Sequence, residues 1–452
     1  MARTPEQNNA IITGNIPRQL LLFFFPIWLG TMFQQLYNTV DTLIVGNFVG
    51  TQALAAVGAT SSFVQLLVGL FVGLCSGAGV IIAQSFGAGD HDEVNRQVHT
   101  ALALAIAGGA ALTVIGLLIS RPVLRLMQTP DEIVGMASEY LQIYFLGMIP
   151  QMIYNMGTNI LRAVGDSKRP LYFLIVASIV NIVLDIVLVA VIPLGVAGAA
   201  IATVASQVVS AVLCIIKLTR SDGPYRLEIK RIGFDLPLLK KITSQGVPSG
   251  VQNSIIAIAN VVVQSNINTF GSDAMAGCGS YSKVEGFVFL PITAFAMALT
   301  TFIGQNLGAG QFDRAKQGAR IGILCSMAMA ELIGVALFFL APYAMRLFND
   351  DPAVVAIGVR QSHIEALFFC FLAFAHGVSA VLRGAGRAQV PMYTMLGCWC
   401  ILRVSYITLA LKVWPDIATI FWAYPITWSV SCVVFLIYYL KADWVHALEK
   451  SL

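Results

Sequence analysis

The sequence predicts an all-α polytopic membrane protein with 12 transmembrane helices in two pseudo-symmetric six-helix lobes. Three observations predict this fold: the composition, a row of long apolar segments and an internal repeat. The 452 residues are 57% hydrophobic and 11% charged, and their mean hydropathy is +0.79. Soluble domains carry about 25% charged residues. Since a soluble chain of this length could not hide so much apolar surface, we expect a membrane around it.

The apolar segments give the number of helices. A membrane-crossing helix needs about 20 predominantly apolar residues. Four prolines inside such segments, Pro26, Pro150, Pro248 and Pro291, are candidate kinks. The first segment contains polar residues and lacks a small-residue cleavage site, so we expect no signal peptide. The expected spans are 17–45, 52–84, 94–120, 133–162, 170–191, 196–217, 243–270, 274–305, 315–341, 353–382, 391–412 and 418–440.

The basic residues predict the orientation in the membrane. An even number of spans puts both termini on one side. With the N-terminus inside, the inner segments hold 20 Lys and Arg residues and the outer segments hold 5. Positively charged loops favour the cytoplasmic side, so we expect cytoplasmic termini in a plasma membrane, the inner membrane of a bacterium. Because the basic residues are spread over the inner loops, they do not indicate a nucleic-acid partner.

A repeat divides the chain into halves. AQSFGAGD at 83–90 matches GQNLGAGQ at 304–311, and LRAVGDSKRP at 161–170 matches LRGAGRAQVP at 382–391. Both pairs are offset by 221 residues. The sequence therefore predicts an N-lobe at 1–217, a cytoplasmic linker at 218–242 and a C-lobe at 243–452. Six helices per half give parallel repeats, which are typical of secondary transporters.

Ionisable residues inside membrane spans are rare and indicate functional sites. Asp41 lies in the first span, and Gln34 and Asn38 share its helical face at spacings of seven and three residues. Asp41 at that depth would be costly unless it has a function or reaches water. We expect Gln34 and Asn38 to line the same cavity as Asp41.

Three further polar residues of the first half lie at a similar depth, by a rise of about 1.5 Å per residue. Asn181 and Asp185 are one helical turn apart in the fifth span, and Thr203 lies in the sixth. Two carboxylates, an amide and a hydroxyl provide the oxygen ligands that a hard cation such as Na⁺ takes. Equally, two nearby carboxylates repel each other, so one of them could hold a proton. The sequence leaves Na⁺ and H⁺ open.

The second half has a different set of polar residues. Glu285 is close to the middle of the eighth span, and we expect it to face a cavity. Asn253 is expected to line a polar cleft from the seventh span. His363 and Glu365 fit a functional site and a structural network with Arg403 equally well.

No enzyme motif appears in the sequence. It contains no HExxH, no GxSxG and no GxxxxGK[ST]. Without an ATP site, ion-coupled transport is expected, with no cofactor besides the coupling ion. The eight cysteines lie in apolar segments and are expected to be buried small residues rather than disulfides or metal ligands.

The motifs resemble the multidrug and toxic compound extrusion (MATE) family over essentially the whole chain. The resemblance rests on VDTLIVGNFVG in the first span, AQSFGAGD, LRAVGD, NIVLD with GVAGAAIATV, and IGQNLGAG. It implies a V-shaped pair of six-helix lobes around a central cleft, and drug/cation antiport driven by Na⁺ or H⁺. By motif, it implies an N-lobe cation site of Asp41, Asn181, Asp185 and Thr203, with cleft residues Tyr140, Asn155 and Glu285.

One span departs from the family pattern. One branch of the family has an acid in the seventh span, but VQNSIIAIANVVVQSN has none. The coupling chemistry is therefore expected in the N-lobe. The predicted function is a monomeric antiporter that exports amphipathic, often cationic, compounds, with a hinge at Pro26 and with lipid as its surroundings.

Two alternatives remain. A flippase for a lipid-linked precursor would need a cationic cleft for the phosphate, whereas the positive charges counted to neither side of the membrane are only Lys283 and Arg403, against several acids. A membrane-embedded enzyme would need a nucleophile with its base, or a metal cluster, near one interface. Neither pattern is legible in the sequence.

Overall fold

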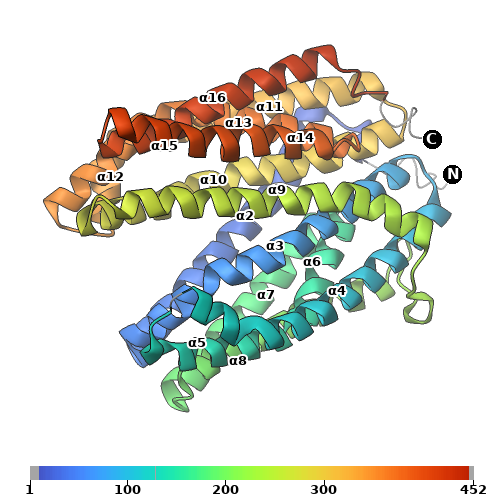
Figure 1. Ribbon diagram of the computed structural model, residues 1–452. Helices are drawn as coiled ribbons and strands as arrows, with labels where there is room; N and C mark the ends of the chain where they lie inside the picture. The colour runs from blue at the N-terminus through green and yellow to red at the C-terminus, as the bar shows by residue number, and fades with distance from the viewer. Residues whose placement is uncertain (1–9, 128, 447–452) are drawn as a thin grey trace. The chain divides into compact units, whose positions relative to one another are not determined.

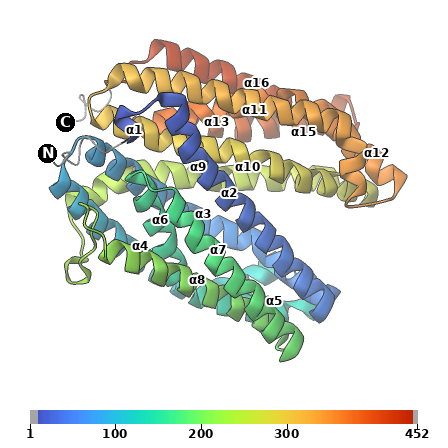
Figure 2. The same ribbon diagram turned by 180° about the vertical axis from the view of Figure 1, so that it is seen from behind.

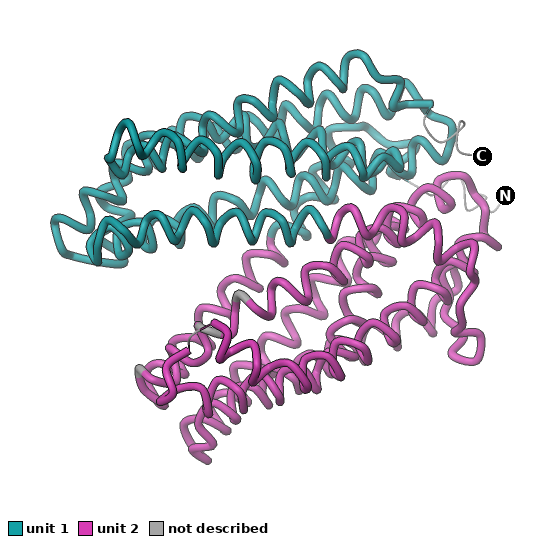
Figure 3. Tube along the Cα trace, in the orientation of Figure 1, with its two compact units in different colours: residues 1–28, 251–452 teal, residues 29–250 magenta. Residues whose placement is uncertain are grey.

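The structure is a computed structural model that describes residues 10–127 and 129–446, and every regular element in these ranges is a helix. Figures 1 and 2 show the helices from opposite sides. They form two compact units (Figure 3). Unit 1 consists of residues 1–28 and 251–452, and unit 2 consists of residues 29–250. Two long helices, α2 (Ile16–Ile44) and α9 (Leu236–Asn268), each contribute one part to each unit.

Unit 2 contains the end of α2 and the beginning of α9. Within it, α4 packs on α3, α5 and α6, and α8 packs on α5, α6 and α7. The other elements of unit 2 are the π-helix η2 (Val45–Val49), α3 (Thr51–Gly87), α4 (His91–Leu126), α5 (Asp131–Leu146), α6 (Met148–Ala163), α7 (Lys168–Asp185), the π-helix η3 (Ile186–Val191), α8 (Gly195–Thr219) and the 3₁₀ turn η4 (Ile229–Arg231).

Unit 1 contains the beginning of α2 and the end of α9. Its centre is formed by three mutually packed helices, α10, α11 and α13. The other elements of unit 1 are α1 (Ala10–Thr13), α10 (Ser272–Gly308), α11 (Phe312–Arg346), α12 (Pro352–Glu365), the 3₁₀ turn η5 (Ala366–Phe368), α13 (Phe369–Gly384), α14 (Gln389–Met395), the π-helix η6 (Leu396–Leu402), α15 (Arg403–Val413) and α16 (Ile417–Lys441).

The helices match the predicted membrane spans, with one exception. Among the described residues, eleven helices are long and apolar enough to cross a membrane. The predicted span 133–162 is not one continuous helix, because α5 ends at Leu146 and α6 begins at Met148. Pro150 explains the interruption, since it has no N–H to donate to the carbonyl four residues earlier, that of Leu146. Leu118 and Leu332 are 72% and 73% exposed, as expected for side chains that face lipid.

The backbone confirms the repeat. Three pairs of glycines adopt positive φ angles, and the two members of each pair are 221 positions apart. The pairs are Gly50 with Gly271, Gly89 with Gly310, and Gly165 with Gly386. The helices α3 and α10 also begin and end at equivalent positions of the two halves. The two halves therefore share one fold, as the matching motifs predicted.

The compact units differ from the predicted lobes 1–217 and 243–452 at the two shared helices. The first part of α2 packs in unit 1, where the rings of Phe24 and Phe295 stack with centroids 4.0 Å apart. Leu20, Phe23 and Ile27 belong to the same buried cluster. Burial of these side chains explains why residues 10–28 pack with the second half of the sequence.

The first part of α9 packs in unit 2 through glycines. A Cβ added at Gly73 would lie 2.1 Å from the backbone N of Gly250, and one at Gly77 would lie 2.4 Å from that of Gly246. Only glycine permits backbones to approach this closely. The shared helices α2 and α9 are thus fixed at their beginnings by different contacts, an aromatic stack in one unit and a glycine crossing in the other.

The segment predicted as a linker, 218–242, is bound to α4. The Asn95 side chain donates to the carbonyl oxygens of Pro224 and Arg226, at 3.2 and 3.1 Å. His99 Nε2 accepts from the backbone N–H of Glu228 at 3.0 Å. Its last residues belong to α9, which begins at Leu236. The segment is therefore a structured part of unit 2.

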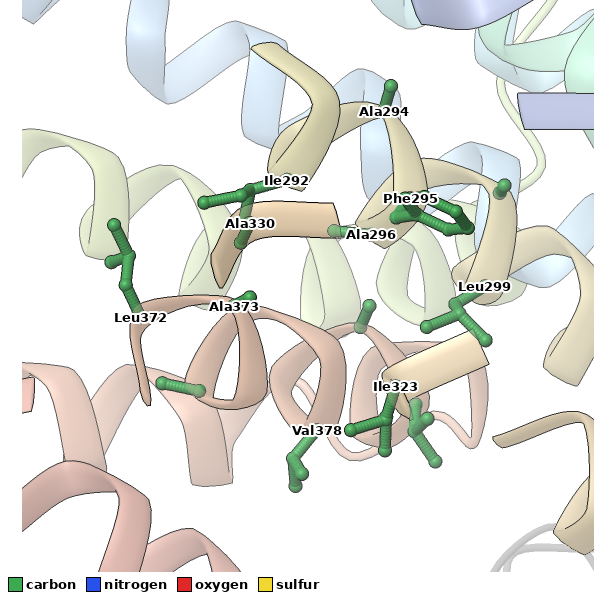
Figure 4. Close-up of a cluster of buried hydrophobic side chains, with 14 of the residues drawn as sticks. Ile292, Ala294, Phe295, Ala296, Leu299, Ile323, Ala330, Leu372, Ala373 and Val378 are labelled. Carbon is green, nitrogen blue, oxygen red and sulfur yellow. The ribbon is translucent and has the colours of Figure 1, made fainter. Parts of the chain in front are cut away.

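The core of unit 1 is shown in Figure 4. Phe295 and Leu299 of α10 meet Ile323 of α11 and Val378 of α13, and all four are at most 5% exposed. The start of α11 also contacts both ends of the described chain, because Arg314 binds Ile11 and Phe312 lies 4.9 Å from the ring of His446. Both ends therefore lie on one side of unit 1, as an even number of spans predicts.

Candidate functional site

Two carboxyl groups meet in unit 2. Asp41 of α2 and Asp185 of α7 lie within hydrogen-bonding reach of each other. Asp185 is the last α-helical residue before the π-helix η3, and Asp41 is one turn before the π-helix η2. Single π-helical turns widen a helix and are frequent at functional sites. The sequence predicted both carboxyls, and the structure brings them together.

The polar atoms around this pair lack protein partners. Asp185 and Asn181 are both fully buried. Five of these atoms form no hydrogen bond with the described residues: both oxygens of Asp185, both polar side-chain atoms of Asn181, and Oδ1 of Asp41. Buried polar atoms normally find a partner, because an unsatisfied one costs about 1–3 kcal/mol. Their chemistry fits a bound cation or a shared proton.

Thr203 is the fourth predicted ligand. It lies on α8, which packs against α7, and it is 7% exposed. Its hydroxyl donates to the carbonyl oxygen of Ala199 at 3.0 Å, so the hydroxyl oxygen can still accept or coordinate through its lone pairs. The set of two carboxylates, one amide and one hydroxyl is a set of oxygen donors that suits a hard cation.

Two tyrosines accompany the carboxyl pair. Tyr37 and Tyr140 each interact electrostatically with both Asp41 and Asp185. Tyr140 is 7% exposed and stacks on Tyr144 with ring centroids 6.0 Å apart. Tyr140 was predicted, but Tyr37 was missed. Its signal is its position one turn before Asp41, on the same helical face.

A polar cavity of about 60 Å³ lies in unit 2. That volume is large enough to hold water molecules. Gln34 and Asn155, both predicted for the cleft, line it. The complete lining is Gln34, Tyr37, Gln151, Tyr154, Asn155, Leu174, Ala177, Ser178, Ser206, Gln207 and Ser210. This lining is rich in amides and hydroxyls, and it includes no acidic or basic side chain.

Unit 1 holds a second polar cluster. The hydroxyl of Tyr281 donates to Glu365 Oε2 at 3.1 Å, and the amide of Gln361 donates to Glu365 Oε1 at 2.9 Å. Arg403 interacts electrostatically with both Glu285 and Glu365. Glu285, predicted to face a cavity, is partly buried on α10, whereas Glu365 and Arg403 are both buried.

His363 has a structural partner. Its Nε2 lies 3.0 Å from the carbonyl oxygen of Phe338 in α11. In the same region, Glu331 of α11 accepts from the backbone N–H of Cys370 at 3.1 Å. These contacts hold the 3₁₀ turn η5, which directly follows Glu365. His363 is thus part of the support for the interrupted helix.

The remaining predicted residues are distributed over the two units. Asn38 is exposed on α2, and its carbonyl oxygen accepts from the hydroxyl of Thr42. Asn253 is exposed on α9, within unit 1. Pro26 lies inside α2, two residues before the boundary between the units. Their roles in substrate binding and in bending stay predictions.

Comparison with known proteins identifies the family. The sequence profile of the MatE family matches residues 26–187 and again residues 248–408, one match for each half of the repeat. The probable multidrug resistance protein YoeA of Bacillus subtilis is 28% identical over 430 residues, 93% of each chain. The probable multidrug resistance protein YpnP of the same organism is 30% identical over 407 residues, 88% of each chain.

Solved structures have the same fold. An outward-facing multidrug resistance MATE family transporter of the MOP superfamily superposes with a TM-score of 0.90 at 24% identity, over the full length of both chains. The all-α membrane fold expected from the sequence is therefore confirmed. The chain is a multi-pass membrane protein, which in bacteria means the inner membrane, and it belongs to the MatE family of transporters rather than to a class of enzymes.

Proposed function

We propose that this chain is a cation-coupled antiporter that exports amphipathic, often cationic, drugs and toxic compounds by alternating access. One observation carries the proposal: Asp41 and Asp185 lie close together, and three of their four carboxyl oxygens are buried without protein partners. Among the described residues, neither carboxyl forms an ion pair with a basic side chain. The pair therefore needs a positive charge from outside the protein, and a coupling cation supplies it.

Two coupling ions suit this pair. Na⁺ would be held by oxygens of Asp41, Asp185, Asn181 and Thr203. H⁺ would be shared by the two carboxyls, because close carboxylates resist simultaneous ionisation. Both ions neutralise the same negative charge, so both give the same coupling scheme. A cation drives a conformational change only if it binds one state more tightly than the other.

The helix α2 links the carboxyl pair to the conformational change. Its first part packs in unit 1, and the part that carries Asp41 packs in unit 2. Pro26, near the boundary, removes one backbone hydrogen bond from the helix. We therefore propose Pro26 as the hinge at which α2 bends when the charge of Asp41 and Asp185 is neutralised.

The substrate class follows from the chemistry of unit 2. Amides and hydroxyls such as those of Gln34, Asn155 and Tyr37 form hydrogen bonds with many different partners. The adjacent carboxyl pair attracts positive charge, and it releases a cationic substrate when a coupling cation takes its place. A flippase for a phosphate-bearing lipid would need basic groups here, and the lining includes none.

The proposal is tested with the purified full-length protein in liposomes. Export of a fluorescent cationic dye is measured with a Na⁺ gradient alone and with a pH gradient alone. We expect one of the two gradients to drive export by the wild type. Asp41→Asn should abolish this export, while Asp131→Asn, which changes an exposed aspartate at the start of α5, should retain it.

Two outcomes would contradict the proposal. Export by Asp41→Asn at the wild-type rate would remove the carboxyl pair from the coupling mechanism. Dye export that neither gradient drives would exclude cation-coupled antiport.

A further inference from the structure

The connection between α8 and α9 in unit 2 exposes large apolar side chains. Ile229 and Phe234 are 65% and 52% exposed, and Leu236, the first residue of α9, is 73% exposed. In a membrane-crossing helix such exposure is expected, because lipid covers the side chains. Ile229 and Phe234 lie outside these helices. Apolar side chains grouped at such a place indicate an interaction surface.

This exposure is not the result of a loose chain. Leu227, between the exposed side chains and α8, is 3% exposed, and Tyr225 and Ile232 pack against the same buried cluster of unit 2. The hydrogen bonds of Asn95 and His99 described above hold the backbone in between. The connection therefore buries one set of apolar side chains and holds the other set, Ile229 and Phe234, in fixed exposed positions.

Cations without partners accompany the exposed apolar side chains. Residues 217–241 contain seven basic and three acidic residues, a net charge of +4. Two of the three acids are already in ion pairs with other arginines. Arg226, Lys230 and Lys240 are exposed and form no ion pair with any residue that the structure describes. The surface of this connection is thus apolar and positively charged at once.

The connection lies at the depth of the lipid headgroups. The helix α4, which binds it, has 36 residues and is about 54 Å long at 1.5 Å per residue. A bilayer with its headgroups is about 40–45 Å thick. Asn95 and His99, the residues that hold the connection, lie about 6 and 12 Å along α4 from its first residue. Their partners in the connection are therefore close to the membrane surface on the side predicted to be cytoplasmic.

We propose that this connection is an interfacial anchor that binds anionic lipids. Ile229 and Phe234 insert between the headgroups, and Arg226, Lys230 and Lys240 bind the lipid phosphates. Apolar side chains beside lysines and arginines are typical of segments that lie in the membrane interface. Anionic headgroups supply the negative charge that complements the unpaired cations. The anchor fixes the start of α9 at the membrane surface, and it goes beyond the proposed antiport because it does not involve the coupling cation.

The test measures hydrogen exchange in the purified full-length protein by mass spectrometry. The protein is placed in nanodiscs of phosphatidylcholine alone, or of phosphatidylcholine mixed with phosphatidylglycerol. The backbone N–H groups of Leu227, Glu228 and Arg231 are hydrogen-bonded, so they exchange when the connection opens locally. Anionic lipid that binds the closed form should slow this exchange. We therefore expect slower exchange at 226–236 in the nanodiscs with phosphatidylglycerol.

A pair of matched variants tests the cations. One Lys or Arg near an anionic surface strengthens binding about fivefold. Arg226→Gln with Lys230→Gln should therefore remove up to about thirtyfold of the slowing. Arg121→Gln with Arg125→Gln removes two exposed cations near the other end of α4 and should keep the slowing at 226–236. Thermal unfolding of each variant identifies the folded proteins that are compared.

A third variant tests the apolar side chains. Ile229→Ser with Phe234→Ser keeps every charge, and it should speed exchange at 226–236 in both kinds of nanodisc, because insertion between headgroups does not need a negative charge. Unchanged exchange in this variant would mean that Ile229 and Phe234 do not insert, and that a partner other than lipid covers them.

Two further outcomes would overturn the anchor. The first is equal exchange of the wild type in the two kinds of nanodisc. The second is equal slowing by inorganic phosphate in phosphatidylcholine nanodiscs, which would mean that the cations bind a free anion rather than a lipid. Asp41→Asn, which tests the proposed antiport, should leave the slowing by phosphatidylglycerol unchanged. Failure of the antiport and failure of the anchor are thus measured separately.

Discussion

The acids of unit 2 and those of unit 1 lie in halves that share one fold but not one chemistry. Three of the four carboxyl oxygens of Asp41 and Asp185 are buried without protein partners, whereas both oxygens of Glu365 accept hydrogen bonds, from Tyr281 and Gln361. The repeat conserves the glycines with positive φ. It does not conserve the acids, since the position equivalent to Asp41 is Val262. A repeated backbone therefore does not imply a repeated site.

The largest effect is expected from a change at Asp185, the fully buried acid of unit 2. Asp185→Asn should abolish cation-driven export, because one carboxyl alone no longer needs the coupling cation. The same change should leave the unfolding temperature equal or higher, because a neutral amide replaces a buried carboxyl without partners. Dye export and thermal unfolding measure the two effects, with Asp131→Asn as the control. A large fall in unfolding temperature would mean that Asp185 is structural.

Each shared helix has an internal proline, Pro26 in α2 and Pro248 in α9. Pro26→Ala restores a backbone N–H in α2, and it stabilises the straight helix by up to about 3 kcal/mol. The bent form would then become up to roughly a hundredfold rarer, and export should slow accordingly while cation binding persists. Export rate and cation binding are measured on the same preparation. Pro248→Ala makes the matching change in α9, and we expect it to slow export less. Unchanged export by Pro26→Ala would exclude the hinge.

The beginnings of the shared helices offer a smaller contrast. In unit 2, α9 crosses α3 at glycines, and a Cβ at Gly77 would meet the backbone N of Gly246 at 2.4 Å. Gly77→Ala should therefore destabilise the protein by about 1–3 kcal/mol. Gly58→Ala in the same helix is the matched control, because a Cβ there meets nothing within 4 Å. The unfolding temperatures of both variants are measured. Equal values would show that the backbones of α3 and α9 can move apart at little cost. In unit 1 the equivalent of Gly77 is Ala298, so the two crossings cannot be equally close.

The smallest effect is expected at the arginines that bind the residues just before α2 and α9. In unit 2, Arg96 pairs with Asp235, just before α9, and this hydrogen bond lowers the pKa of Asp235. A lowered folded-state pKa stabilises the protein above the unfolded value of about 3.9, and the stabilisation is lost as the pH falls through the folded value. In unit 1, Arg314 instead donates to the carbonyl oxygen of Ile11 at 2.9 Å, and to that of Gly14. Carbonyl oxygens do not titrate in this range.

The test of this contrast compares unfolding temperatures of the wild type and Asp235→Asn as a function of pH. The wild type should be slightly more stable near neutral pH, and the difference should vanish in acid. High salt should reduce it as well, since Arg96 is exposed and Asp235 is partly exposed to solvent. A difference in unfolding temperature that persists in acid would mean that the charge of Asp235 does not cause the stabilisation.

The sequence predicted the repeat, the number of helical segments and the acids of unit 2, because glycine motifs and intramembrane charges are visible one residue at a time. It did not predict the sharing of α2 between the units. This sharing depends on the stacking of Phe24 on Phe295, which are far apart in the chain. The contact of Tyr281 with Glu365 was missed for the same reason, since the two residues lie 84 positions apart.

The lining of the unit 2 cavity was predicted in part. Gln34 was predicted because it shares a helical face with Asp41, and Asn155 because the family resemblance implies it, whereas Tyr154, Ser178 and Ser206 were not predicted. Tyrosines and serines are ordinary residues of membrane helices, because a serine hydroxyl can return its hydrogen bond to its own helix. Ser178 does so to the carbonyl oxygen of Leu174. Only the packing of α6, α7 and α8 shows that these side chains share one cavity.

The central claim is that Asp41 and Asp185 bind the coupling cation, and infrared difference spectroscopy tests it most directly. The carboxyl stretching bands of the wild type are recorded before and after addition of the coupling ion, as Na⁺ or as acid. We predict a change in these bands that Asp131→Asn retains and that both Asp41→Asn and Asp185→Asn lose. An unchanged difference spectrum in both of these variants would contradict the account.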